Sequence, residues 1–266
     1  MSTLSTYHKN LFTTFFDTFE LARNSSSMRD IHKVRVSIKK IKSLNDLVLQ
    51  YKNRKKYNTG YNKVLKNVFQ SAGRIREQQI HLKLLQKTDK KVFEIYFKHI
   101  HKEYKNNLLL LGNSLRLVSV DQLKVENKPI EKKLKKLGKE HINEHVSSYV
   151  YNKLMLIGIL KKYAHIDEVL HDIRTEFRTI RDALILCKEL GIDSAYSALL
   201  EELNPLIDTI GTWHDYNVLN ASLAELKANT KKKKDLKHIE KHLKNSLQKE
   251  QKLKSKIINK EIGLLI

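Results

Sequence analysis

Two stretches of the chain, residues 31–42 and 170–181, repeat one pattern of apolar and basic residues with the same spacing. At about 3.6 residues per turn of an α-helix, the apolar residues of each stretch fall on one side and the basic residues on another. Each stretch is therefore predicted to be a helix with one buried side and one cationic side. The apolar residues are Ile31, Val34, Ile38 and Ile41 in the first stretch and Leu170, Ile173, Phe177 and Ile180 in the second.

The basic residues form a stripe on each predicted helix, in the same register. They are His32, Arg35, Lys39 and Lys42 in the first stretch and His171, Arg174, Arg178 and Arg181 in the second, at an offset of 139 residues (171 − 32). Each stripe is nearly free of acidic residues, and four such groups along about 15 Å of helix can hold several phosphates in a row. Lys and Arg ordinarily form a solvated helix face, but the repetition favours an anion site. We expect the two stripes to face a common concavity and a shared anion.

A second repeated block follows each striped helix. Residues 73–80 read GRIREQQI and residues 211–218 read GTWHDYNV, at an offset of 138 (211 − 73), and one loop residue accounts for the slip. In each block a glycine is followed three residues later by a basic residue and then by an acidic one. We expect Glu77 and Asp215 to pair with basic side chains of the striped helices and fix their orientation. The basic residues predicted at the margins of the site are Lys40, Arg74, Arg76 and His214.

The rest of the sequence indicates an all-α protein. The 266 residues include only 2 Pro and 8 Gly, and 41% are hydrophobic, which favours helices over strands. Ser27 and Asp167 are predicted to begin the striped helices, and Gly191 to end the second one. Apolar periodicity predicts helices over about 4–23, 28–53, 61–86, 89–112, 130–163 with a bend or break near Gly138 or Gly158, 167–190, 194–203, from Pro205 onward, and 231–262.

The chain is predicted to consist of two halves, at about 4–118 and 129–262. Residues 118–129 lose the helical period and end in Pro129, which suits the first turn of a new helix. We therefore expect a non-helical join there. Repetition of the motifs on both sides of the join predicts a duplicated helical bundle with a pseudo-two-fold axis.

The charge of the chain predicts anionic partners. A formal charge of +22 and a pI near 9.8 attract nucleic acid, phosphate polymers and anionic membranes alike. The first residues lack the basic start and apolar core of a signal peptide, and no apolar run approaches about 18 residues. We expect a soluble, cytoplasmic protein that has no membrane partner. The single cysteine, Cys187, cannot form an intramolecular disulfide and is expected to be a small core residue.

The sequence offers little support for metal binding or catalysis. His32 and His171 lie among cations without a carboxylate or cysteine at ligand spacing, so a divalent ion would be repelled. The dipeptides His171-Asp172 and His214-Asp215 are reminiscent of metal-dependent phosphohydrolases, but the further ligands are not recognisable. No Gly-rich phosphate loop, His-Glu-x-x-His or Gly-x-Ser-x-Gly motif is present. We assign no catalytic residue, no metal and no cofactor.

The two stripes and the two Gly-x-x-basic-acidic blocks, in this order, resemble the CHAD family of histidine-containing α-helical domains over about residues 4–255. The resemblance implies a single domain of two four-helix bundles related by a pseudo-two-fold axis. It also implies a basic groove or cavity between the bundles that binds inorganic polyphosphate without catalysis, and an association with polyphosphate granules. Lysines stand at 39, 40 and 42, where the family usually has arginines, which keeps the charge but loses the bidentate fork.

The leading hypothesis is a polyphosphate-binding protein in which both stripes contact one anion. Binding should be multivalent and salt-sensitive, because each neutralised phosphate releases counterions. Non-specific nucleic-acid binding is the alternative. It would need aromatic side chains interleaved with bases, or a helix that presents base-reading groups, and the stripes have neither. Nucleic acid is therefore expected at most as a competitor of polyphosphate.

Overall fold

The computed structural model describes residues 3–25, 27–49, 60–135, 139–192 and 194–259, and within these ranges the chain forms helices and no strands. The all-α prediction is confirmed. Residues 50–53, Gly138 and residues 260–262, which belonged to predicted helices, lie outside the described ranges. The helices are α1 (Thr3–Ser25), α2 (Met28–Leu49), α3 (Gly60–Thr88), α4 (Lys90–Arg116), α5 (Val120–Leu134), α6 (Lys139–Lys161), α7 (Asp167–Glu189), α8 (Ser194–Asn229) and α9 (Lys233–Ile258).

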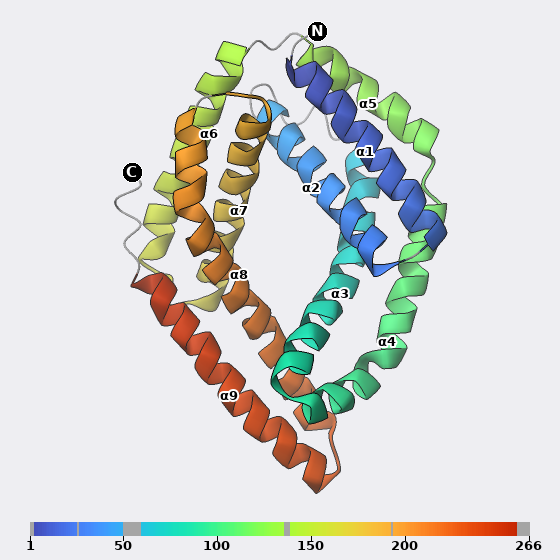
Figure 1. Cartoon of the computed structure of the whole chain (residues 1–266), viewed down its shortest axis with the longest axis vertical. Coiled ribbons are helices and arrows are strands. Elements are labelled where there is room, and N and C mark those ends of the chain that lie inside the picture. Colours follow the sequence, from blue (N-terminus) through green and yellow to red (C-terminus); the bar gives the residue numbers. More distant parts are fainter. Residues whose placement is uncertain (1–2, 26, 50–59, 136–138, 193, 260–266) are drawn as a thin grey trace.

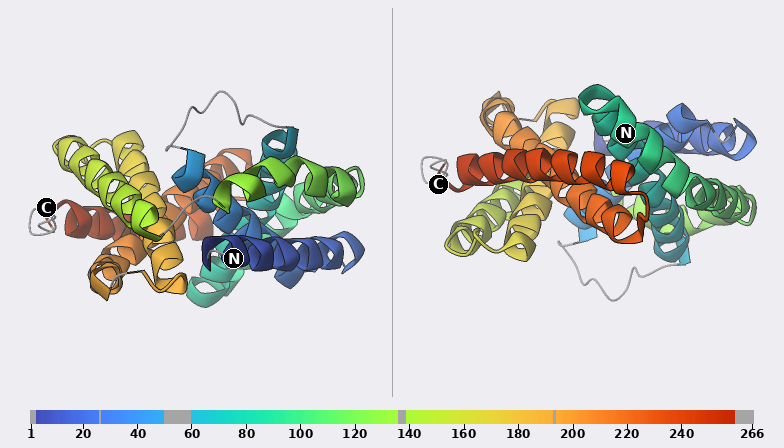
Figure 2. Two further views of the ribbon diagram at one scale, coloured as in Figure 1. Left: turned by 90° about the horizontal axis from the view of Figure 1, so that it is seen from above. Right: turned by 90° about the horizontal axis from the view of Figure 1, so that it is seen from below.

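The helices are arranged as two sets of four with α5 between them in sequence (Figure 1). Helices α1 to α4 lie on one side of the molecule and α6 to α9 on the other, and views from above and below show the same division (Figure 2). Corresponding helices meet across the division: α2 contacts α7, α3 contacts α8, and α4 contacts α9. Helix α5 packs along α1. The exact pseudo-two-fold relation stays a prediction, but this arrangement brings the two striped helices, α2 and α7, side by side.

The ends of the striped helices are set by local hydrogen bonds. At the start of α2, the Ser27 hydroxyl oxygen accepts from the Asp30 backbone N–H at 3.1 Å, and the hydroxyl donates to the Asp30 carboxylate at 2.6 Å. Helix α7 begins differently, because Ile166 is its N-cap residue and Asp167 is the first residue inside the helix. The expectation that Asp167 caps α7 is therefore wrong. Gly191 follows the end of α7 with a φ of 63°, a conformation that glycine adopts without strain.

Both proline residues lie inside helices, so two predicted breaks are wrong. Helix α5 covers most of the expected non-helical join and contains Pro129, and α8 runs through Pro205 without ending at residue 203. A proline in a helix frees the carbonyl four residues earlier, which is that of Val125 or Glu201. Both residues are exposed, as are the prolines, so water can bond to the freed carbonyls. Gly158 likewise lies within α6 and does not break it.

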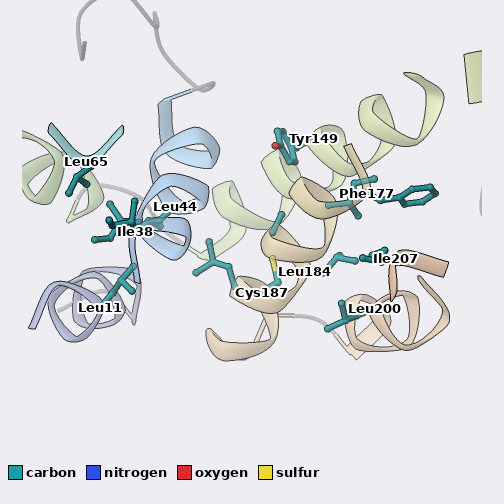
Figure 3. Packing of buried hydrophobic residues seen from close by; sticks show 14 of the residues in the cluster. Leu11, Ile38, Leu44, Leu65, Tyr149, Phe177, Leu184, Cys187, Leu200 and Ile207 are labelled. Carbon is teal, nitrogen blue, oxygen red and sulfur yellow. The ribbon is translucent and has the colours of Figure 1, made fainter. Parts of the chain in front are cut away.

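One large apolar core joins the two sets of helices. It includes Ile38 and Leu44 of α2 together with Phe177, Leu184 and Cys187 of α7 (Figure 3). Cys187 is fully buried, as expected of a small core residue. A second, smaller core lies where α3, α4, α8 and α9 meet, around Tyr96 and Leu223. Among the described helices, none has a stretch apolar and long enough to cross a bilayer.

Candidate anion-binding site

The two striped helices bury their apolar stripes and leave their basic stripes partly covered. Ile41, Phe177 and Ile180 are fully buried, as the spacing predicts. The basic side chains that lie half-buried between the two sets of helices form what we call the basic cluster. They are Arg35 and Lys39 of α2, Arg76 of α3, Arg174, Arg178 and Arg181 of α7, and His214 of α8.

The charges of the basic cluster lie close enough to influence one another. Burial lowers the pKa of Arg35 to about 10, with further lowering by Arg178 and Arg76. Burial also lowers the pKa of Arg174 to about 10, and Arg178, Arg181 and Arg35 add to the effect. Cations of α2 therefore lie near enough to cations of α7 to repel them. A concavity shared by the two whole stripes stays a prediction.

Lys39 and Arg181, one from each stripe, line a common cavity of about 320 Å³. Burial lowers the pKa of Lys39 to about 8; Asp182 opposes the shift, and Arg178 and Arg181 add to it. The Asp182 carboxylate lies 4.0 Å from Lys39 Nζ and accepts a hydrogen bond of 3.2 Å from the Ser43 hydroxyl. Each stripe alone has few acidic residues, but α7 thus supplies an acid to α2, which the sequence did not reveal.

Arg35 is held in place by α3. Its Nη1 donates a hydrogen bond of 2.8 Å to the Phe69 carbonyl, and its guanidinium carbon lies 3.9 Å from the centre of the Phe69 ring. A Cβ atom at Gly73 would lie only 2.9 Å from Arg35 Nη1. The glycine of the first repeated block therefore makes room for the guanidinium. Sequence patterns singled out Gly73 without this reason, and they gave no signal for Phe69.

Two arginines of α7 have unused hydrogen-bonding capacity. The Nε atoms of Arg174 and Arg181 are buried and have no hydrogen-bond partner. The Nη1 atom of Arg181 lies 3.7 Å from the exposed carboxylate of Asp208. A buried donor without a partner costs free energy. These two Nε atoms are therefore the groups of α7 that would gain most from an added acceptor.

The histidines of the stripes differ in their surroundings. His32 and His171 are exposed, whereas His214 is half-buried, and the rings of His171 and His214 lie 5.3 Å apart. Burial lowers the pKa of His214 to about 4, with a further contribution from Arg174. The pKa of His32 is lowered by burial and then by Arg76. A polyanion would reverse the electrostatic part of these shifts.

The remaining predicted residues lie outside the basic cluster. Lys40 is exposed and lines the same cavity as Lys39, and its Nζ lies 2.9 Å from the Glu189 carboxylate of α7. Lys42 and Arg74 are exposed. Glu77 favours the charged form of Arg35 and Asp215 that of Arg174. Their pairing with basic side chains of the striped helices stays a prediction. Among the described residues, no group of three or more His, Cys, Asp or Glu side chains is arranged to hold a metal ion.

Comparison with known proteins shows which domain this arrangement of helices resembles. A model of the CHAD domain matches residues 141–261, which include most of α6 and all of α7, α8 and α9. The crystal structure of the CHAD domain from the plant Ricinus communis is similar with a TM-score of 0.71, over 98% of this chain and 92% of that one. Residues 141–261 thus match the CHAD domain, and the chain as a whole has the fold of a CHAD domain. At 12% sequence identity, the likeness to the plant CHAD domain concerns the fold alone. No curated protein matches the chain.

Proposed function

We propose that this protein binds inorganic polyphosphate in the basic cluster and does not catalyse a reaction. The observation that carries the proposal is the convergence of α2 and α7 on one cluster, in which the buried Nε atoms of Arg174 and Arg181 have no partner. Clustered cations repel one another and lower each other's pKa, so the free site is electrostatically unfavourable. A bound polyanion removes that repulsion and supplies the missing acceptors.

A linear phosphate polymer suits this cluster better than a single phosphate. The cations are distributed along two adjacent helices, so several phosphates must bind at once to use them all. Each contact releases counterions, and affinity should fall steeply as salt increases. We further propose that the protein acts in the cytoplasm, where it would accompany polyphosphate granules.

A charge-matched pair of variants tests the proposal. The site variant replaces Arg35, Lys39, Arg174 and Arg178 by Ala, and the control replaces Lys237, Lys241, Lys244 and Lys252 of α9, all exposed, by Ala. Both variants lose four positive charges. Filter binding with long-chain polyphosphate should show a loss of about 100-fold or more for the site variant and a small loss for the control. Circular dichroism checks that each is folded, and equal losses in the two folded variants would contradict the proposal.

Nucleic acid is the alternative partner, since it also carries a regular row of phosphates. The cluster contains arginines, a lysine and a histidine but no row of aromatic rings on which the successive bases of a strand could stack. Polyphosphate should therefore survive competition by DNA or RNA at equal phosphate concentration. Displacement by nucleic acid would favour the alternative, and release of phosphate in the presence of Mg²⁺ or Mn²⁺ would contradict a purely binding role.

A further inference from the structure

The cavity beside the basic cluster has two kinds of wall. It is bounded by α1, α2, α7 and the start of α8, and its volume is about 320 Å³. Its cations are Lys39, Lys40 and Arg181, of which Lys39 and Arg181 belong to the basic cluster. The apolar part of the wall consists of Val36, Leu44, Ile185 and Leu186. Small-molecule sites are typically about 300–1,000 Å³ in volume and mostly apolar with a few polar groups, and this cavity has that character.

The cavity wall contains groups that the binding of a bare phosphate chain does not require. Phosphate oxygens gain nothing from the apolar wall, and the carboxylate of Asp182, which also lines the cavity, repels them. Asp182 accepts a hydrogen bond from Ser43, but a carboxylate has about four lone-pair sites and can accept further N–H donors. Asn204, at the cavity wall, can both donate and accept. The wall fits a flat, weakly polar group that carries N–H donors.

Tyr7 adds an aromatic ring to the cavity wall. Burial, and then the nearby Glu189 carboxylate, raise the pKa of the Tyr7 hydroxyl. The aromatic ring at the wall offers a surface on which a heteroaromatic base can stack. Arg181 lines the same cavity, and its buried Nε has no partner. A ligand with a base at one end and phosphates at the other would therefore satisfy both parts of the lining.

We propose that this cavity binds the base of a nucleoside polyphosphate, with its phosphates in the basic cluster. The inference rests on the proposed function, because the same cations hold the phosphates, and it adds a subsite for the nucleoside. It predicts that a nucleoside triphosphate binds more tightly than inorganic tripolyphosphate. Charge alone predicts the reverse order, because tripolyphosphate carries the same number of phosphates and more negative charge.

Isothermal titration of the whole chain with ATP and with tripolyphosphate, in metal-free buffer of one ionic strength, compares the two directly. We expect ATP to bind tighter by about tenfold or more. If tripolyphosphate binds and ATP binds no better, the nucleoside subsite is overturned and the proposed function stands. If neither these ligands nor long-chain polyphosphate binds, both proposals are overturned.

Substitutions in the cavity wall test whether the base of the nucleotide binds there. Tyr7→Phe keeps the ring and should keep the advantage of ATP, whereas Tyr7→Leu should remove it. Val36→Trp should fill the cavity from a side chain that is 37% exposed, so the fold should tolerate it, and ATP should then bind no better than tripolyphosphate. The matched control is Val125→Trp on α5, at a side chain 60% exposed, which should change neither ligand. An undiminished ATP advantage in folded Tyr7→Leu and Val36→Trp would place the base elsewhere and overturn the inference.

Discussion

Helices α2 and α7 carry the same stripe, yet the arginines at corresponding positions have different surroundings. Arg35 of α2 donates to the Phe69 carbonyl and lies over the Phe69 ring. Arg174 occupies the equivalent place in α7, and its buried Nε has no partner. The residue that corresponds to Phe69 by the offset of 138 is Ile207, which has no aromatic face (207 − 69).

The glycines of the repeated blocks show the same contrast. A Cβ at Gly73 would crowd the Arg35 guanidinium, whereas a Cβ at Gly211 would meet no atom within 4 Å. The two copies of the pattern thus carry similar charges, but their arginines have different contacts. The arginine of α2 contacts α3, whereas two arginines of α7 have an Nε atom without a partner, as the proposed anion site would need.

The largest expected effect comes from removing equal charge from the two stripes. Arg174→Ala with Arg178→Ala should weaken polyphosphate binding by about 100-fold, and Arg35→Ala with Lys39→Ala by about tenfold. The reason is that Arg35 already donates to Phe69 and Lys39 lies beside Asp182, so both give less to a ligand. Filter-binding titrations at one salt concentration measure the ratio. Equal losses would show that only the total charge matters.

A smaller effect is expected from adding one methyl group to each glycine. Gly211→Ala should stabilise α8 by up to about 1 kcal/mol, because alanine favours the helix and its Cβ meets open space. Gly73→Ala should stabilise α3 by less than this, because the Arg35 guanidinium must shift and its hydrogen bond to the Phe69 carbonyl weakens, which offsets part of the same helical gain. Urea unfolding of both variants gives the difference. Equal stabilisation of both would mean that the contact of Arg35 with α3 contributes nothing.

The pH dependence of binding should be moderate and should depend on His214. Its pKa of about 4 in the free protein lies below the unfolded value of 6.5, so the unfolded state binds more protons between those values. Stability of the free protein should therefore fall as the pH is lowered from 6.5 towards 4. A bound polyanion raises this pKa, so affinity should increase fewfold between pH 7 and pH 5.

Calorimetry in buffers of different ionisation enthalpy measures the proton uptake that accompanies binding. His214→Asn should remove part of the uptake, whereas His99→Asn, at an exposed position on α4, should leave it unchanged. The same uptake in His214→Asn and the parent protein would assign the linkage to other groups, such as His32.

The smallest effects are expected for the predicted residues outside the basic cluster. Lys42 and Arg74 are exposed, so either Ala substitution should reduce polyphosphate affinity by less than about threefold, mainly through the loss of long-range attraction. Titration of the two single variants tests this expectation. A tenfold loss at either position would extend the site beyond the cluster on that side.

Helical periodicity predicted the parts of the fold that depend on local sequence. It located α2 and α7 and their buried faces, because the spacing of apolar residues determines which side can face a core. It failed at Pro129 and Pro205, where a local rule predicted helix starts. Buried residues on both sides of Pro205, such as Leu203 and Leu206, hold the helix together through tertiary packing.

The site was predictable to the extent that it lies on one helix face. The stripes gave Arg35, Arg174 and Arg178, but spacing along a helix says nothing of what approaches that face from elsewhere. The bond between Lys40 and Glu189 joins residues 149 positions apart, and Asp182 meets Ser43 across 139 positions. Such pairs depend on how α2 and α7 are placed in space, so they emerged only from the structure.

The separation of the two apolar cores has a consequence for local unfolding. The larger core joins α2 to α7, while the smaller one closes the far end of the molecule around α3, α4, α8 and α9. Separate cores can open with separate free energies, and the smaller one should open first in amide hydrogen exchange. The basic cluster takes side chains from α2, α3, α7 and α8, so it touches helices of both cores. A ligand bound to the basic cluster would therefore link the helices of both cores, so that the amide hydrogens at the two ends of the molecule exchange as one cooperative unit.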